Sequence, residues 1–346
     1  DISLYEPSDH YWQTDRLWHL TSIQADLAWG ITTGDPEVKI AILDTWFDIE
    51  HPDLAEKIEP HYDPYCNTPF SADCTKSHHG TTVASFAAAH TDGGGHLSSI
   101  GFNSMIIPYR AHGIGYVGHL ARAHHASLAM NADVITSSAG GWRCGYVSIP
   151  ENNPYYEIER IAVKEILDNG TVIIMPAGNG PTGVHCRPVG STYDQPWYPY
   201  HPKHDDRIII VTSVGEDDNH YYFHEENERE ETHSHYPEVD LCAPGYKTLG
   251  ARGTLKKEYD DEGIFIGCIE SWPYWDNCTG TSFSTPIVAG LAALIKSIDK
   301  DLTPAEIKYI LKSTTDPVLD AEDYEGLIGT GKINAYESVK FANDCP

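Results

Sequence analysis

Short apolar runs alternate along this chain with stretches in which apolar residues recur every three to four positions. The runs are rich in β-branched residues and predict buried strands at 39–43, 105–109, 133–137, 171–175, 207–214 and 239–243. The periodic stretches predict helices at 23–29, 79–90, 117–130, 155–168, 284–298, 304–311 and 334–341. Alternation of this kind predicts an α/β fold in three layers, with a mostly parallel β-sheet flanked by helices on both faces.

No internal repeat or long linker interrupts this pattern. We therefore interpret residues 1–346 as a single domain, with residues 1–30 as an N-terminal segment packing on it. Two stretches are predicted to be surface insertions. Residues 216–231 are acidic and predict a solvated loop, the alternative being a cation site or a partner surface. Residues 246–276 run up to the helix at 284–298 and are expected to shape a cleft.

The formal net charge of −28 excludes some partners. A field of that sign repels phosphate backbones and anionic lipid, which argues against nucleic-acid and membrane-surface partners. It favours solubility and, as a weaker inference, basic substrates. No stretch approaches the roughly 18 consecutive apolar residues that span a bilayer. The first residues carry no basic start and no apolar block, so any secretory signal is expected to have been removed already.

Eight cysteines are spread singly through loop-like sequence, and none forms a Cys-x-x-Cys pair. They predict disulfides made in an oxidising compartment, and hence secretion, the alternative being free thiols in a cytosolic protein. Short separations in the chain close at little entropic cost, which favours the pairs Cys66–Cys74 and Cys268–Cys278. Cys144 and Cys186 both follow predicted strand ends and form the third pair. Elimination leaves Cys242–Cys345 as the fourth.

Three segments carry candidate chemistry. Ser282 lies between a glycine turn and an apolar helix, where helix-start N–H groups surround its hydroxyl. By itself this segment fits an N-capped core helix equally well. Asp44 ends a buried strand, the place where open α/β sheets put functional groups, and His79 opens a helix of small residues. An aspartate, a histidine and a serine at the edges of regular elements are the parts of a charge-oriented nucleophile.

In this order along the chain, the three residues resemble the subtilisin-like serine peptidases. The resemblance rests on three local motifs, namely Asp44-Thr45 with His51-Pro52-Asp53-Leu54, His79-Gly80-Thr81, and Gly280-Thr281-Ser282 with Pro286. It implies a subtilisin-like fold, with Ser282 as nucleophile, His79 as general base and Asp44 orienting the imidazole. His78 is the rival for the base, but the family motif requires the histidine directly before Gly-Thr.

The resemblance also assigns residues that contact the substrate. Asn179, which alone would be interpreted as a turn residue, matches the side-chain amide of the oxyanion hole, and Ala177 and Gly178 precede it. Ser138, Ala139 and Gly140 match the segment that pairs with the substrate backbone as an added strand; the alternative is a strand followed by a glycine turn. Trp46 and Thr82 depart from the family pattern, which puts the cleft shape and the substrate preference in doubt.

The resemblance implies no cofactor for catalysis but a structural calcium ion. Asp53 matches a family aspartate that joins such a site, and residues 91–95 match the loop that completes it. Alternatively, Asp53 caps a short helical turn. Polypeptide substrates are the expected partners. We further expect a monomer from which an N-terminal propeptide is removed before maturity.

The sequence therefore predicts a secreted serine endopeptidase that hydrolyses peptide bonds through an acyl-enzyme on Ser282. A processing peptidase of narrow specificity in the same family is the first alternative, because Trp46 and the insertions restrict the cleft. An inactive binding protein on the same fold is the second, although no member of the triad is missing.

Overall fold

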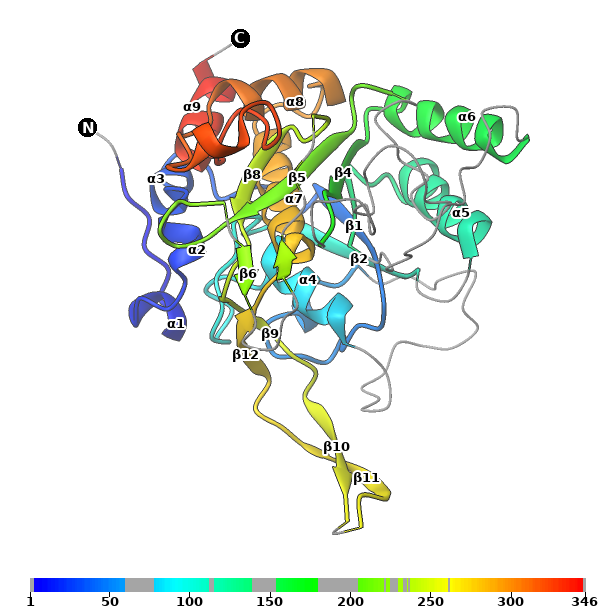
Figure 1. Ribbon diagram of the computed structural model, residues 1–346, viewed down its shortest axis with the longest axis vertical. Helices are drawn as coiled ribbons and strands as arrows, with labels where there is room; N and C mark the ends of the chain where they lie inside the picture. Colours follow the sequence, from blue (N-terminus) through cyan, green and yellow to red (C-terminus); the bar gives the residue numbers. More distant parts are fainter. Residues whose placement is uncertain are drawn as a thin grey trace.

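A six-stranded sheet forms the centre of the molecule, and each of its neighbouring strand pairs is parallel (Figure 1). The computed structural model describes residues 3–59, 78–111, 115–138, 154–179, 205–220, 222–224, 230–232, 235, 237–260 and 262–344. The strands are β1 (Lys39–Asp44), β2 (Met105–Arg110), β3 (Val134–Ser137), β4 (Val172–Pro176), β5 (Ile209–Val214) and β8 (Leu241–Pro244). Their order is β2-β1-β3-β4-β5-β8.

Helices cover both faces of this sheet, which gives three layers and confirms the predicted fold class. One face carries α3 (Ala25–Trp29), α4 (His79–Ala88), α7 (Thr281–Lys296) and α9 (Ala335–Asp344), and the other carries α5 (Gly115–Leu128) and α6 (Pro154–Asp168). Strand β1 shows why: Ile40 and Ile42 join the core under α4 and α7, whereas Ala41 and Leu43 join the core under α5 and α6. Side chains of a strand alternate between faces, so a strand buried on both faces is apolar throughout.

The remaining helices are short or peripheral. The elements are α1 (His10–Gln13), α2 (Trp18–Thr21), α8 (Pro304–Ser313) and the 3₁₀ turns η1 (Ala55–Lys57) and η2 (Ala321–Tyr324). In α8, Thr303 and Glu306 form a reciprocal capping box behind a first-turn proline. Within the described part of the chain, no helix is both long and apolar enough to cross a membrane.

The strand order places the candidate residues. The chain passes from β1 to β2 on one side and then crosses to β3 on the other side of β1. In parallel sheets the carboxyl ends of strands at such a reversal border a crevice. Asp44 ends β1 and Ser138 directly follows β3, so both lie at this edge.

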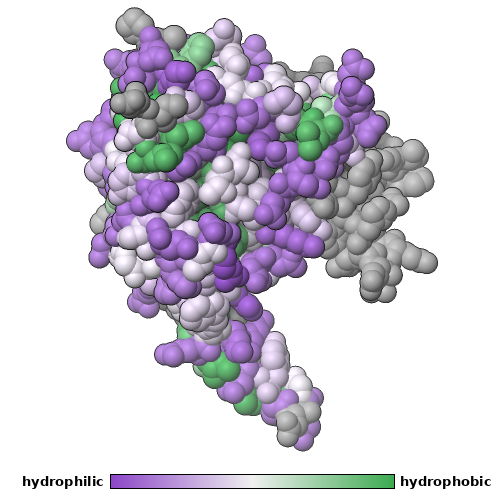
Figure 2. Space-filling model, turned by 90° about the vertical axis from the view of Figure 1, so that its left-hand side faces the viewer, coloured by the Kyte–Doolittle hydropathy of each residue, from purple (hydrophilic) through white to green (hydrophobic). Residues whose placement is uncertain are grey.

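A two-stranded arm projects from the body below β9 and β12 (Figure 1). Strands β9 (Thr248–Ala251) and β12 (Tyr274–Cys278) pair antiparallel on the body, and β10 (Leu255–Tyr259) and β11 (Phe265–Glu270) form the arm, which we define as residues 252–273. Figure 2 shows the arm standing clear of the body with apolar side chains on its surface. The predicted insertion at 246–276 thus consists mostly of paired strands. The predicted loop at 216–231 also contains strands, β6 (Tyr222–His224) and part of β7 (Glu230–Thr232).

Two of the four predicted disulfides are wrong. Cys242 and Cys278 are buried free thiols, which excludes Cys242–Cys345 and Cys268–Cys278. Sequence proximity misled the second pairing, because Cys268 lies on the arm while Cys278 ends β12, whose partner is β9. Cys278 Sγ donates to the Trp275 carbonyl at 3.4 Å and Cys242 Sγ to that of Ile328 at 3.2 Å. The pairings Cys66–Cys74 and Cys144–Cys186 lie outside the described residues.

Candidate active site

Asp44 and His79 form a hydrogen-bonded pair at the edge of the sheet. Asp44 Oδ1 lies 2.8 Å from His79 Nδ1 and also accepts the Thr45 N–H at 2.6 Å. The Asp44 side chain is fully buried, whereas that of His79 is 29% exposed. Because a carboxylate only accepts hydrogen bonds, His79 Nδ1 carries the proton and Nε2 is left as the basic nitrogen.

The start of α4 holds His79 in place. The Gly80 N–H donates to Thr45 Oγ1 at 3.0 Å, so the residue after Asp44 satisfies a helix-start donor. A Cβ at Gly80 would lie 2.9 Å from the Trp46 carbonyl oxygen and 3.0 Å from the Phe47 ring. A glycine is therefore needed for α4 to approach the chain that leaves β1.

The surroundings of His79 act on its pKa in opposite directions. Burial disfavours the charged imidazolium and lowers the pKa, whereas the charge of Asp44 and its hydrogen bond favour the imidazolium and raise it. The net effect is a pKa above the ordinary value of 6.5. His79 is thus a stronger base than a free histidine.

Ser282 is the exception in a buried helix. Every residue of α7 except Ser282 is buried. Pro286 lacks an N–H, so the Ser282 carbonyl has no donor one turn later in the helix, and Ser138 Oγ donates to it at 3.0 Å. In return, Ser282 Oγ lies 3.5 Å from the Ser138 carbonyl oxygen, and Phe283 sets its ring 5.3 Å from that of His79. The end of β3 and the start of α7 are therefore joined beside His79.

Asn179 is fixed by the residue that precedes Ser282. The Thr281 N–H donates to Asn179 Oδ1 at 2.9 Å, and Thr281 Oγ1 lies 3.1 Å from the same oxygen. The Gly178 N–H donates to Thr281 Oγ1 at 3.1 Å. Because Oδ1 is the acceptor here, the other end of the amide is the Nδ2 donor. Thr281 thereby ties the end of β4 to the start of α7 and orients the amide.

The structure thus brings together Asp44, His79, Ser282 and Asn179 at the edge of the sheet, with Ser138 bonded to Ser282. Ala177 is buried, and its N–H donates to the Val211 carbonyl at 2.7 Å. The predicted substrate contacts Ala139 and Gly140 lie outside the described residues. Sequence reasoning missed the bracing role of Thr281. Its place between a glycine turn and the helix, with a hydroxyl beside orphan N–H groups, was the available signal.

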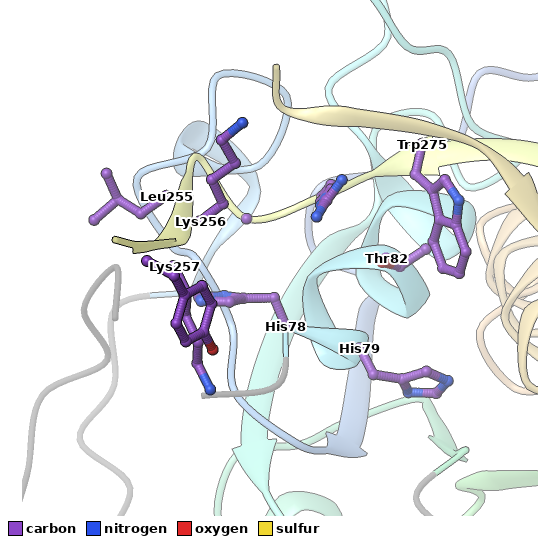
Figure 3. A pocket seen from close by; sticks show the side chains of 10 residues that line it. His78, His79, Thr82, Leu255, Lys256, Lys257 and Trp275 are labelled. Carbon is purple, nitrogen blue, oxygen red and sulfur yellow. The ribbon is translucent and has the colours of Figure 1, made fainter. Parts of the chain in front are cut away.

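His78 has a different position from His79. It lines a pocket of about 540 Å³ together with His79, Thr82, Trp275 and residues of the arm (Figure 3). The arm passes close by, since a Cβ at Gly253 would lie 2.7 Å from the His78 ring. Both adjacent histidines line this pocket, but it is His79 that contacts the Asp44 carboxylate, at 2.8 Å.

Asp53 does not fit the expected calcium site. Its Oδ1 accepts the N–H groups of His96 at 2.7 Å and Leu97 at 3.0 Å, and its Oδ2 accepts the Tyr274 hydroxyl at 2.6 Å. Three donors point hydrogens at this fully buried carboxylate, which is the environment of a satisfied hydrogen-bond acceptor rather than of a cation ligand. His51 packs beside it, with Nδ1 accepting the Asp53 N–H at 3.1 Å and Nε2 lying 3.0 Å from the Pro273 carbonyl oxygen.

Comparison with known proteins agrees with this geometry. The model of the subtilase family matches residues 35–332, so the chain belongs to that family. It is 27% identical to the thermophilic serine proteinase of Bacillus sp. strain AK1, and the match covers 97% of this chain and 70% of that protein. It is 26% identical, also over 97%, to the full length of thermitase from Thermoactinomyces vulgaris. The chain is a serine protease.

Solved structures show the same fold. Fervidolysin from Fervidobacterium pennivorans matches with a TM-score of 0.69 at 20% identity, covering 98% of this chain and 47% of that one. A protease of Pseudoalteromonas arctica matches with a TM-score of 0.65 at 24% identity, covering 98% and 100%. The resemblance inferred from the three motifs is confirmed.

Proposed function

We propose that this chain is an endopeptidase in which Asp44, His79 and Ser282 form the catalytic triad and Asn179 belongs to the oxyanion hole. The observation that carries the proposal is the 2.8 Å contact between His79 Nδ1 and the buried Asp44 carboxylate. It leaves Nε2 as a base with a raised pKa, and the His79 ring lies 5.3 Å from the ring of Phe283, the residue after the half-buried Ser282.

In this mechanism Ser282 Oγ attacks the scissile carbonyl carbon while its proton moves to His79 Nε2. Asn179 Nδ2 and the Ser282 N–H stabilise the oxyanion of the tetrahedral intermediate. When the intermediate collapses, the C–N bond breaks and His79 returns the proton to the leaving amine. Water then hydrolyses the Ser282 ester by the same sequence in reverse roles. Asp44 keeps Nδ1 protonated and stabilises the imidazolium throughout.

The test is active-site labelling combined with cleavage mapping. An organophosphonate should modify Ser282 in wild type, and neither Ser282→Ala nor denatured wild type should be modified. Ser282→Ala should also lose about 10⁶ in turnover, the loss known for subtilisin itself when the triad is broken. Internal cleavage of an unfolded protein supports the endopeptidase mode. Label on another residue, or release of terminal residues alone, would refute the assignment.

A peptidase of narrow specificity is the second candidate. It is favoured by the arm, which stands beside His79 and whose β10 residues help to wall the adjoining pocket. Digestion of several unrelated denatured proteins separates the two candidates. A broad endopeptidase degrades all of them, whereas a narrow one leaves most of them intact.

We also propose that the protein acts outside the cell and that its other six cysteines form disulfides. Support comes from the relatives, which include an extracellular protease of Natrialba magadii, although a major intracellular protease of Bacillus subtilis is also similar. Thiol titration after denaturation without reductant tests this. Two thiols are expected, from Cys242 and Cys278, whereas eight would refute the proposal.

A further inference from the structure

We infer that the pocket between α4 and the arm binds an acidic side chain of the substrate on the leaving-group side of the scissile bond. This inference rests on the proposed function, because it concerns the substrate of the same site. The described residues that line the pocket include three cations, Arg252, Lys256 and Lys257, and no carboxylate. Both lysines line the pocket from the arm, and Figure 3 shows Lys257 close to His78 at the start of α4, whereas Lys256 extends from the strand in another direction.

These cations stand out against the net charge of the chain, where 51 acidic residues face 23 lysines and arginines. Several described cations have a carboxylate partner, and Lys39, Lys300, Lys308, Lys312 and Lys332 each form at least one ion pair. Within the described part of the chain, Arg252, Lys256 and Lys257 form none. Three unpaired cations around one pocket in a protein of net charge −28 make a local site for an anionic group.

The base of the arm is fixed, so the cations are held beside His79. Asp48 is fully buried, and its Oδ2 accepts the Thr254 N–H at 2.8 Å and the Thr254 hydroxyl at 2.6 Å. The Arg252 N–H donates to the Pro273 carbonyl at 2.6 Å, and this hydrogen bond joins the segment that enters the arm to the segment that leaves it. Hydrogen bonds at the base therefore set the position of the backbone that carries the three cations, although the cationic side chains themselves are exposed.

The elements that form the pocket indicate which side of the scissile bond it serves. In the proposed function, the acyl part of the substrate pairs with the segment that begins at Ser138, after β3. The pocket is lined instead by α4, β10 and β12, on the other flank of His79. A chain that passes Ser282 and continues beyond His79 therefore presents its leaving-group residues to the pocket.

Trp275 and Tyr259 add apolar surface to the same pocket. Their rings can cover the methylene stem of a glutamate while the carboxylate meets the lysines. The pocket therefore fits a polypeptide with Glu or Asp within the first few residues after the cleaved bond. The overall acidity of the protein by itself favours basic substrates, so the inferred preference for acidic residues rests on the cations of this pocket.

The test uses internally quenched peptides that share one acyl sequence, taken from a mapped cleavage site. Glu, Gln or Lys is placed at each of the first three leaving-group positions. Wild type should cleave the best Glu peptide about 5- to 20-fold faster in kcat/KM than its Gln counterpart, since exposed ion pairs contribute only a few-fold each. The ratio should fall toward one near 1 M salt, where the screening length is about 3 Å.

Variants then locate the effect. Lys256→Gln and Lys257→Gln should each lower the Glu to Gln ratio by two-fold or more, whereas the control Lys340→Gln, which removes an exposed lysine on α9, should leave the ratio at the wild-type value. The ratio compares two substrates in one preparation, so a partly folded variant still reports it. Equal rates for Glu and Gln in wild type, or a preference confined to the acyl side, would overturn the inference.

A p-nitroanilide with the same acyl sequence has no leaving-group residues. It therefore separates a failure of the pocket assignment from a failure of the proposed function. Hydrolysis of the anilide with equal rates for the Glu and Gln peptides refutes the assignment of the pocket to acidic side chains alone. Failure to hydrolyse both the anilide and the peptides refutes the proposed function, and the pocket assignment with it.

Discussion

Within the described part of the chain, two aspartates lie beside a histidine, and the two pairs differ in their geometry. In the Asp44–His79 pair, the carboxylate contacts Nδ1 and the partly exposed ring keeps Nε2 as a base of raised pKa. In the Asp53–His51 pair, both side chains are fully buried, and burial lowers the pKa of His51 despite the nearby carboxylate. A backbone N–H, rather than the carboxylate, is the hydrogen-bond partner of His51 Nδ1.

The difference teaches that proximity of the two residue types is not enough for the role proposed for Asp44 and His79. What matters is which ring nitrogen meets which group and whether the other nitrogen remains available. In His51, Nδ1 accepts a backbone N–H and Nε2 meets a carbonyl, so the ring is held neutral with both nitrogens engaged. In His79, one nitrogen is fixed and the other is available for proton transfer.

The largest expected effect comes from exchanging each histidine for glutamine. His79→Gln should lower kcat by about 10⁵ to 10⁶, a loss of the size known for subtilisin, with little change in melting temperature. His51→Gln should do the reverse, lowering stability while the folded fraction keeps turnover within about tenfold. Rates per active site, obtained by titration with a covalent inhibitor, check both. Equal kinetic losses in the two variants would break the comparison.

Asn179→Ala should lower kcat by roughly 10²–10³ with little change in KM, as in subtilisin, because an oxyanion donor acts mainly in the transition state. Asn343→Ala, an exposed change on α9, is the matched control. Normal turnover in Asn179→Ala would leave Asn179 as a turn residue that Thr281 braces for structural reasons alone.

The two histidines should also respond to pH with opposite signs. The proposed mechanism requires neutral His79, so kcat/KM should fall about tenfold per pH unit below an apparent pKa higher than 6.5. The raised pKa gives the folded state a stabilisation that is complete below pH 6.5 and is lost as the pH rises through the folded value.

His51 belongs with His19 and His119, whose pKa values burial lowers to about 3 and about 4. Their unfolded forms bind protons that the folded forms do not, so their contribution to stability is present above pH 6.5 and is lost as the pH falls below it. Chemical denaturation between pH 4 and 8 checks the sign. Stability that rises on acidification through this window would contradict it.

The smallest effect on activity is expected from Tyr274→Phe. Removing the hydroxyl takes one of three donors from the buried Asp53 carboxylate, which should cost about 1.5–3 kcal/mol of unfolding free energy. Turnover should stay normal. Tyr309→Phe, at a tyrosine 63% exposed, should change stability by less than about 0.5 kcal/mol. A chelator should leave the melting temperature of wild type unchanged if this hydrogen-bond network, and not a cation, holds Asp53.

The sequence predicts the central sheet and its helices well, because strands buried on both faces and the apolar α7 leave strong periodic signals. It fails for the arm. In β10 the side chains are mostly exposed, so no apolar alternation marks the strand. The partners of Asp53 were also beyond prediction, because Tyr274 lies 221 residues away in the chain. The pairing of Cys268 with Cys278 is wrong because nearness in sequence is not nearness in space, and Cys242–Cys345, which rested on elimination, is wrong with it. The positions of Asp44 and His79 could be predicted, because each ends or begins an element that the pattern identifies.

The arm has a consequence for the lifetime of the enzyme. Two strands without a third are barely stable alone, and this ribbon leaves Ile264 and Ile266 about 60% exposed, at 63% and 58%. In a solution of protease molecules, each such ribbon is a segment that the cleft of another molecule can reach. Loss by mutual cleavage requires two molecules, so the rate of inactivation should rise with the square of concentration, and the same projection that lines the pocket beside His79 sets how densely the enzyme can be stored.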